Sequence, residues 1–182
     1  MIGTEAATAP APASTIAPTK RENRLDGITF RPATEAEWPT VSANFYSMWQ
    51  DMGLSSMIVE DCATQTLKFL GSDRATELKV CPIVAVADDK VVGSGLCQLF
   101  EGYYPLIYKT SEYREGWIWG VYVSPEYRKR GIAEQIVKTC NERLKEIGCT
   151  HSLLHAAPGK PGRRVYSRMG YTDYELMELH LE

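Results

Sequence analysis

Three consecutive basic residues, Arg128, Lys129 and Arg130, stand directly before Gly131 and an amphipathic stretch that predicts a helix. The first N–H groups of a helix have no partner inside the helix, and the helix dipole adds positive potential at the same end. Arginine and lysine side chains add charged hydrogen-bond donors. A basic, glycine-containing turn that leads into a helix therefore predicts a binding site for a phosphate group.

The segment before this turn predicts the strand that positions it. Residues 117–123 are rich in aromatic and β-branched side chains, and Ser124-Pro125 ends the strand because proline cannot continue a central one. Strand-to-helix turns are common anion-binding positions in α/β proteins. The glycine patterns of P-loop nucleotide hydrolases and of dinucleotide-binding enzymes are missing from the sequence, which argues against both classes.

The composition limits the remaining function classes. The chain has 182 residues, enough for one domain with a substantial core, and its formal net charge of −3 gives no overall basic field for nucleic acid or for a membrane. No apolar run in the sequence approaches the roughly 18 residues that a membrane helix needs. The cysteines form no C-x-x-C pair, which argues against a zinc ribbon and favours reduced thiols in a cytoplasmic protein. They are Cys62, Cys81, Cys97, Cys140 and Cys149.

Two parts of the chain differ in composition. Residues 1–27 are rich in Ala, Pro and Thr and predict a disordered extension, whereas residues 28–182 predict a single domain. Strands are expected over residues 28–31, 83–87, 91–100, 117–123, 151–156 and 174–181. Helices are expected over residues 35–51, 61–71, 132–147 and 163–169, with a charged, solvated linker over 73–79. This order predicts an α/β (α+β) fold in which helices pack on a mixed sheet.

Local signals mark two of these boundaries. The segment Thr34-Glu35-Ala36-Glu37 has the capping-box pattern, which predicts the start of the first helix. Asp88-Asp89-Lys90 lies between two strand-like runs and predicts a hairpin turn.

Two motifs, which follow each other along the chain, resemble those of a known family. Residues 121–133 are similar to the acyl-CoA signature of the GNAT superfamily, the general-control-related N-acetyltransferases. The core of that signature is Gln or Arg, two further residues, Gly, one residue, and Gly or Ala, and it is matched by Arg128, Gly131 and Ala133. Residues 165–171 resemble the late family element in which a tyrosine is followed, four residues on, by Gly and then Phe or Tyr.

The resemblance implies a fold and an activity. The expected fold is a mixed, mostly antiparallel central sheet of six to seven strands, flanked by about four helices and splayed open between the fourth and fifth strands. The expected activity is N-acetyl transfer from acetyl-CoA to a primary amine, by direct attack in a ternary complex. No metal is expected, and a homodimer is one family-level assembly.

The resemblance also assigns the acetyl-CoA contacts. The pyrophosphate is expected on the N–H groups of the turn before the helix, and the pantetheine arm on the backbone of Val121 and Val123. Gly120 lies inside the strand, where a glycine often marks a bulge, and the N–H of Val121 is the expected oxyanion donor. The full set of expected contacts is Val121, Tyr122, Val123, Arg128, Lys129, Arg130, Gly131, Ile132 and Ala133.

Proton transfer needs an acid and a base. Tyr166 falls on the family's tyrosine and is the expected general acid for the departing thiolate. The position that carries a glutamate base in many relatives is Trp117 here. Glu115 lies two residues earlier and so on the same face of the strand, Glu101 ends the preceding strand, and a chain of water molecules is a third alternative.

The acceptor and two histidines are less constrained. His151 and His155 share a face of one expected strand, but a metal site needs a third ligand, so surface or core histidines are the favoured interpretation. The loop over residues 101–115 carries four tyrosines and is a candidate substrate wall. They are Tyr103, Tyr104, Tyr108 and Tyr113.

The tyrosines of this loop and the scattered carboxylates of the chain favour a small cationic amine as acceptor. Peptide or protein amines are an alternative, and so is a non-catalytic acyl-CoA-binding sensor. Nucleic-acid binding is disfavoured, because the basic cluster is local and the net charge is negative.

Overall fold

The computed structural model describes residues 24–102, 107–157 and 159–174. The extension expected over residues 1–27 lies outside the described residues up to position 23. Tyr103 and Tyr104 lie outside them, as does the strand expected over 174–181 beyond its first residue.

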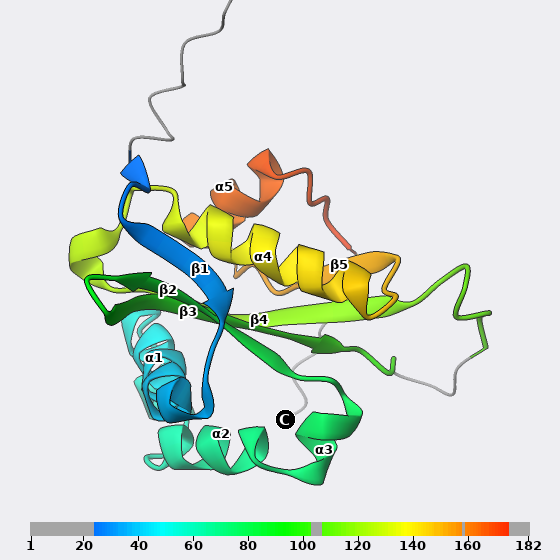
Figure 1. Ribbon diagram of the computed structural model, residues 1–182, viewed down its shortest axis with the longest axis horizontal. Helices are drawn as coiled ribbons and strands as arrows, with labels where there is room; N and C mark the ends of the chain where they lie inside the picture. The colour runs from blue at the N-terminus through cyan, green and yellow to red at the C-terminus, as the bar shows by residue number, and fades with distance from the viewer. Residues whose placement is uncertain (1–23, 103–106, 158, 175–182) are drawn as a thin grey trace, which may run out of the picture.

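A single mixed sheet forms the centre of the described part (Figure 1). Its strands follow the chain in the order β1-β2-β3-β4-β5; the first three pairs are antiparallel, and β4 and β5 are parallel. The mixed, mostly antiparallel sheet agrees with the expectation, but the described residues form five strands rather than six or seven. The strands are β1 (Ile28–Pro32), β2 (Cys81–Ala87), β3 (Lys90–Leu99), β4 (Glu115–Val123) and β5 (His151–Leu154).

Helices cover both faces of this sheet (Figure 1). One face carries α4 (Ile132–Glu146) and α5 (Pro161–Arg168), and the other carries α1 (Trp38–Asp51) and α2 (Cys62–Leu70). The described residues also form three short 3₁₀ helices, over 35–37, 55–57 and 125–127.

A fifth α-helix, α3 (Asp73–Glu77), corrects the linker expected over residues 73–79. Ser72 caps it by accepting a hydrogen bond from the backbone N–H of Ala75 at 3.2 Å. Ala75 and Leu78 are buried, being 4% and 7% exposed. Ala75 and Leu78 are three residues apart and therefore lie on one side of a helical turn. The sequence did not reveal this short apolar face, because charged residues surround it.

The sheet separates two hydrophobic cores. On the α4 face the fully buried side chains include Ile83, Ile118 and Ile136. On the α1 face, Val41 and Leu70 of the helices pack on the strand residues Val84 and Leu96. Neighbouring strand residues thus alternate between the cores, as a sheet covered on both faces requires.

Three glycines let α4 lie very close to the sheet. A Cβ on Gly95 would lie 2.8 Å from Cγ2 of Ile136, and one on Gly93 would lie 3.2 Å from Cδ1 of the same side chain. A Cβ on Gly116 would lie 2.5 Å from Cδ2 of Leu144. The absence of side chains at these strand positions therefore sets the height of α4 above the sheet.

The two local signals are confirmed. The backbone N–H of Thr34 donates to Oε2 of Glu37 at 2.8 Å, completing the capping box, although the first turn is 3₁₀ and α1 begins only at Trp38. Ala87 and Lys90 are paired across the hairpin, which leaves Asp88 and Asp89 as a two-residue turn. Both aspartates have positive φ, as a type I′ turn demands.

Candidate active site

β4 leaves its neighbour β5 halfway along its length. The two strands are paired only from Glu115 opposite His151 to Ile118 opposite Leu154. β5 ends there, whereas β4 continues to Val123. The expected opening between the fourth and fifth strands is therefore present, and it begins at Trp119.

A bulge lies where the opening begins. Opposite β3, Trp119 pairs with Leu96 and Tyr122 pairs with Ser94, so that two residues of β4, Gly120 and Val121, face one residue of β3. Such a bulge leaves the extra residue unpaired and turns the strand locally. It is the feature that the mid-strand glycine predicted.

Only glycine fits at position 120. Its φ is +64°, in the left-handed region that side chains disfavour. A Cβ would also lie 2.8 Å from Cδ1 of Leu96 and 3.1 Å from Cδ2 of Phe45. Backbone conformation and packing against α1 thus both hold the bulge in place.

The backbone beyond the bulge faces the opening. The N–H of Ser124 donates to the carbonyl of Val92 on β3 at 3.0 Å, so the backbone N–H of residue 124 faces β3. Because directions alternate along a regular strand, the polar backbone groups of Val123 point away from β3. That edge has no strand partner among the described residues, and it presents amide groups that an extended ligand could pair with.

The turn after β4 presents unpaired N–H groups. Lys129 and Gly131 have positive φ values of 62° and 97°, and the first helical bond is donated by Gln135 to the carbonyl of Gly131. Within the described residues, no backbone acceptor takes the N–H of Lys129, Arg130 or Gly131. Successive N–H groups in such a conformation form an anion-binding concavity. A Cβ on Gly131 would meet no atom within 4 Å, so the space beside it is open.

The arginine side chains of this turn already have protein partners. Arg128 donates from Nε to the carbonyl of Val123 at 2.8 Å, forms an ion pair with Asp51 at the end of α1, and lies over the ring of Tyr122. Arg130 donates to the carbonyl of Arg24 at 3.2 Å. Arg128 therefore links the turn to β4 and to α1, while the free backbone N–H groups are the donors open to an anion.

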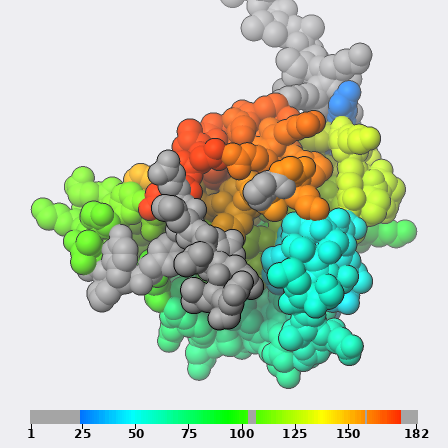
Figure 2. Space-filling view, turned by 180° about the vertical axis from the view of Figure 1, so that it is seen from behind, coloured from blue at the N-terminus to red at the C-terminus, as the bar shows by residue number. Residues whose placement is uncertain are grey.

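The end of α1 also contacts the segment before α5 (Figure 2). Lys160 donates from Nζ to the carbonyl of Met52 at 3.0 Å. Together with the Asp51–Arg128 pair, this contact places α1 beside both the basic turn and the β5–α5 connection. Neither contact joins residues that are close in sequence, and no sequence pattern pointed to Asp51 or Met52.

Tyr166 lies on α5 and packs on the α4-side core. Burial, with smaller contributions from Tyr171 and Cys140, raises the pKa of its hydroxyl to about 12. Among the described residues, no hydrogen bond reaches that hydroxyl. The neighbouring ring of Tyr171, 6.1 Å away between centroids, differs in this respect. Its hydroxyl donates to Asn141 Oδ1 at 3.0 Å and contacts Ser152 Oγ at 2.8 Å.

The two expected carboxylates lie at the closed end of the sheet. Glu115 accepts a hydrogen bond from the hydroxyl of Tyr113 at 2.8 Å, and this bond raises the pKa of Tyr113 above its ordinary value. Glu101 pairs with Arg74 at 2.5 Å, and its side chain is 54% exposed. The structure does not bring either carboxylate to the opened part of β4.

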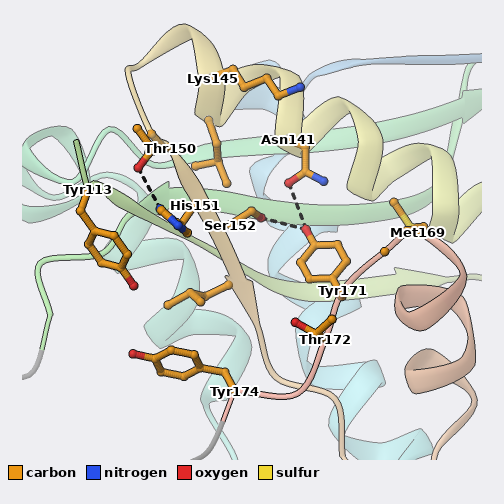
Figure 3. Close-up of a pocket in the computed structure, with 14 residues that line it drawn as sticks. Tyr113, Asn141, Lys145, Thr150, His151, Ser152, Met169, Tyr171, Thr172 and Tyr174 are labelled. Atoms are coloured by element: carbon orange, nitrogen blue, oxygen red, sulfur yellow. Dashed lines mark hydrogen bonds between the residues drawn. The ribbon is translucent and has the colours of Figure 1, made fainter. Parts of the chain in front are cut away.

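A separate pocket of about 410 Å³ lies along β5 (Figure 3). It is enclosed by the C-terminal half of α4, by β5 and by residues 169–174, and its wall includes the Asn141–Tyr171–Ser152 hydrogen bonds. None of its lining residues belongs to the bulge or to the basic turn. The sequence did not predict this pocket, because it depends on where residues 169–174 pass along β5.

Two further features are absent from the described residues. No group of three or more His, Cys, Asp or Glu side chains in them could hold a metal ion. Nor does any helix in this part of the chain have the length and apolar character to cross a membrane.

Comparisons with known proteins agree with the fold. The model of the family described as acetyltransferase (GNAT) family matches residues 44–171. The chain resembles a predicted acetyltransferase from Clostridium acetobutylicum solved with acetyl-CoA, with a TM-score of 0.71, 21% identity, and coverage of 84% of this chain and 96% of the other. It also resembles an aminoglycoside acetyltransferase from an uncultured soil metagenomic sample in complex with sisomicin, with a TM-score of 0.61, 17% identity, and coverage of 87% and 97%.

One curated protein was matched over part of its length. A thialysine N-epsilon-acetyltransferase of Sus scrofa is 32% identical over 80 residues, which are 43% of this chain and 47% of the relative. The match therefore spans about half of the curated relative.

Proposed function

The chain belongs to the GNAT acetyltransferase family, and on that premise we propose that it transfers the acetyl group of acetyl-CoA to a primary amine of a small acceptor, by direct attack in a ternary complex. The observation that carries this proposal is the open, bulged edge of β4 leading into a turn with unpaired N–H groups. An extended chain of amides that ends in a pyrophosphate matches both features.

The residues of the turn bind the phosphate end of the donor. The N–H groups of Lys129, Arg130 and Gly131 have no described backbone acceptor, and the space beside Gly131 is open. The N-terminus of α4 adds its dipole, and the cationic side chains add potential. Arg128 fixes the turn against Val123 and Asp51, so we assign it a positioning role.

The residues of the opening carry out the transfer. Val121 presents its N–H on the free edge, where it stabilises the negative charge that develops on the thioester oxygen. The amine nitrogen forms a bond to the carbonyl carbon, and the carbon–sulfur bond breaks. Tyr166 gives its proton to the departing thiolate, and a raised pKa of about 12 keeps that proton in place at neutral pH until it is needed.

The small, cationic acceptor is supported by the relatives. The curated relative is a thialysine N-epsilon-acetyltransferase, and one structural neighbour was solved with sisomicin. Both names point to amines on small molecules. We extend this class of acceptor to the present chain and, because its five cysteines are free thiols, propose a cytoplasmic location.

Thiol release from acetyl-CoA tests the proposal. The purified chain is assayed with thialysine, sisomicin and a lysine-containing peptide, and Tyr166→Phe is compared with Tyr171→Phe as the matched control. We expect a small amine to be acetylated and Tyr166→Phe to lower kcat by about 10²-fold or more. Tyr171→Phe removes a hydroxyl already bonded to Asn141 and should retain most activity. Acetyl-CoA binding without acetylation of any amine would favour the non-catalytic sensor, and turnover of the peptide alone would exclude the small acceptor.

A further inference from the structure

Among the described residues, neither the basic turn nor the bulged part of β4 supplies a carboxylate to accept the proton of the incoming amine. Amines with ordinary basicity are protonated at neutral pH and must lose a proton before they attack. Glu115 lies four residues before Trp119, where β4 and β5 part, and at ~3.3 Å per strand residue this separation is about 13 Å. Glu101 follows β3 at the same closed end and is paired with Arg74.

His155 lies at the opening itself. It is the second residue after Leu153 and directly follows Leu154, the last residue of β5, which pairs with Ile118. His155 is thus the first residue after the last β4–β5 pair, at the end where β4 continues to Trp119 without a partner on β5. The side chain is exposed, so a substrate can reach its ring.

Aromatic side chains hold the imidazole on the α1 face of the sheet. The ring of His155 meets the ring of Trp117 edge-on, with centroids 4.8 Å apart and an interplanar angle of 81°. Trp117 is itself stacked on Phe100 at 5.3 Å. Trp119, two residues along the same face, contacts Phe45 of α1 at 5.1 Å. The imidazole therefore lies at the end of an aromatic row that runs from Phe100, just after β3, through Trp117 to the residue that follows β5.

We propose that His155 accepts the proton from the acceptor amine, an inference that rests on the proposed acetyl transfer. A ring nitrogen of His155 takes one proton from the ammonium group, and the neutral amine then attacks the thioester carbonyl. The amine nitrogen loses a second proton as the amide forms, while Tyr166 protonates the thiolate of CoA. That second proton restores Tyr166 through water, and His155 releases its own to solvent, so one proton is produced in each turnover.

His151, the first residue of β5, provides a matched control. It lies four residues, or about 13 Å of extended chain, before His155. Its ring packs on Tyr113 with centroids 4.3 Å apart, and its Nδ1 is 2.9 Å from Oγ1 of Thr150. It is a histidine of similar exposure at the closed end of the sheet, where no transfer is proposed.

The experiment compares His155→Ala, His155→Gln and His151→Ala in the full chain, with thialysine or sisomicin as acceptor, whichever the wild type acetylates. We expect both His155 variants to lose about 10²–10⁴-fold in kcat, as general-base removal does elsewhere, while His151→Ala stays within about threefold. The Kd for acetyl-CoA should stay within about twofold in all three. Added imidazole should restore His155→Ala in a concentration-dependent way, which a merely structural role would not allow.

Each other outcome has a defined meaning. A His155→Gln enzyme with wild-type kcat would overturn the inference and leave the proposed function intact. A loss of activity in His155→Ala that imidazole does not restore would overturn the role in proton transfer. If the wild type binds acetyl-CoA and acetylates no amine, the proposed function fails and this inference fails with it.

Discussion

Replacing Gly120 with alanine should separate the role of the β4 bulge from that of an ordinary glycine. The new Cβ would be held at a φ of +64°. A side chain in that left-handed region costs about 1–2 kcal/mol. The Cβ would also lie 2.8 Å from Cδ1 of Leu96, a side chain with no exposed surface, and overpacking of this kind costs about 1–3 kcal/mol.

The sum predicts a loss of about 2–5 kcal/mol in the free energy of unfolding, out of the roughly 5–15 kcal/mol that a domain has. Gly131→Ala is the control, because Gly131 also has a positive φ but no atom within 4 Å of its Cβ position. It should lose only the conformational part, about 1–2 kcal/mol.

Urea denaturation followed by tryptophan fluorescence measures both losses under the same conditions. The difference between the two variants isolates the contacts with Leu96 and Phe45. If Gly120→Ala were no less stable than Gly131→Ala, the packing argument for the bulge would be wrong. The folded fraction of Gly120→Ala should also have a lower kcat by about 10²-fold, because a displacement of the Val121 N–H by about 1 Å is enough for such a loss.

Two further predictions concern the ion pairs at the two ends of α1. Arg128→Ala removes the bond to the Val123 carbonyl as well as the pair with Asp51, and should weaken acetyl-CoA binding about tenfold, the value of one charge-assisted hydrogen bond. Asp51→Ala leaves the bond to Val123 and should weaken acetyl-CoA binding less than Arg128→Ala does. The free energy of unfolding should change by at most about 1 kcal/mol, because both partners of the ion pair are exposed. If calorimetric titration showed a larger loss of acetyl-CoA affinity in Asp51→Ala than in Arg128→Ala, the positioning role of Arg128 would be contradicted. Glu37→Gln removes a carboxylate that Arg31 contacts at 2.8 and 2.9 Å and whose pKa is lowered, mainly by that arginine, from 4.5 to about 2. The wild type should therefore be more stable than Glu37→Gln by about 1–2 kcal/mol above pH 4.5, and the difference should shrink as the pH falls toward 2. A gap that is the same at pH 3 and pH 7 in urea titrations would show that the ion pair does not cause it.

Local patterns predicted most of the fold. The expected helix over 132–147 agrees with α4 within one residue, because a long apolar stripe and a following glycine mark both its faces and its end. The Asp88-Asp89 turn and the capping box were likewise readable, since each depends on residues adjacent in sequence. The linker over 73–79 was wrong because a one-turn helix carries too few apolar positions to show a period.

The candidate site was only partly accessible from sequence. The bulge at Gly120 and the unpaired turn before α4 follow from short motifs and are present. The Arg128–Asp51 pair joins residues 77 positions apart, and no local pattern predicts such a contact. His155 was seen only as a member of a histidine pair; its place beside the opening depends on where β5 stops pairing with β4.

The three glycines beneath α4 have a consequence for any mutational scan of the chain. Gly93, Gly95 and Gly116 allow Ile136 and Leu144 to approach the strands directly. A methyl group at Gly116 would push on Leu144 near the C-terminal end of the helix, whereas one at Gly93 or Gly95 would push on Ile136 and move the turn at the N-terminus away from the free edge of β4. Substitutions there should weaken acetyl-CoA binding from the opposite side of α4, without any contact to the ligand. Positions that lose binding in such a scan will thus report two different things, the surface that meets the donor and the spacing of the layers beneath it.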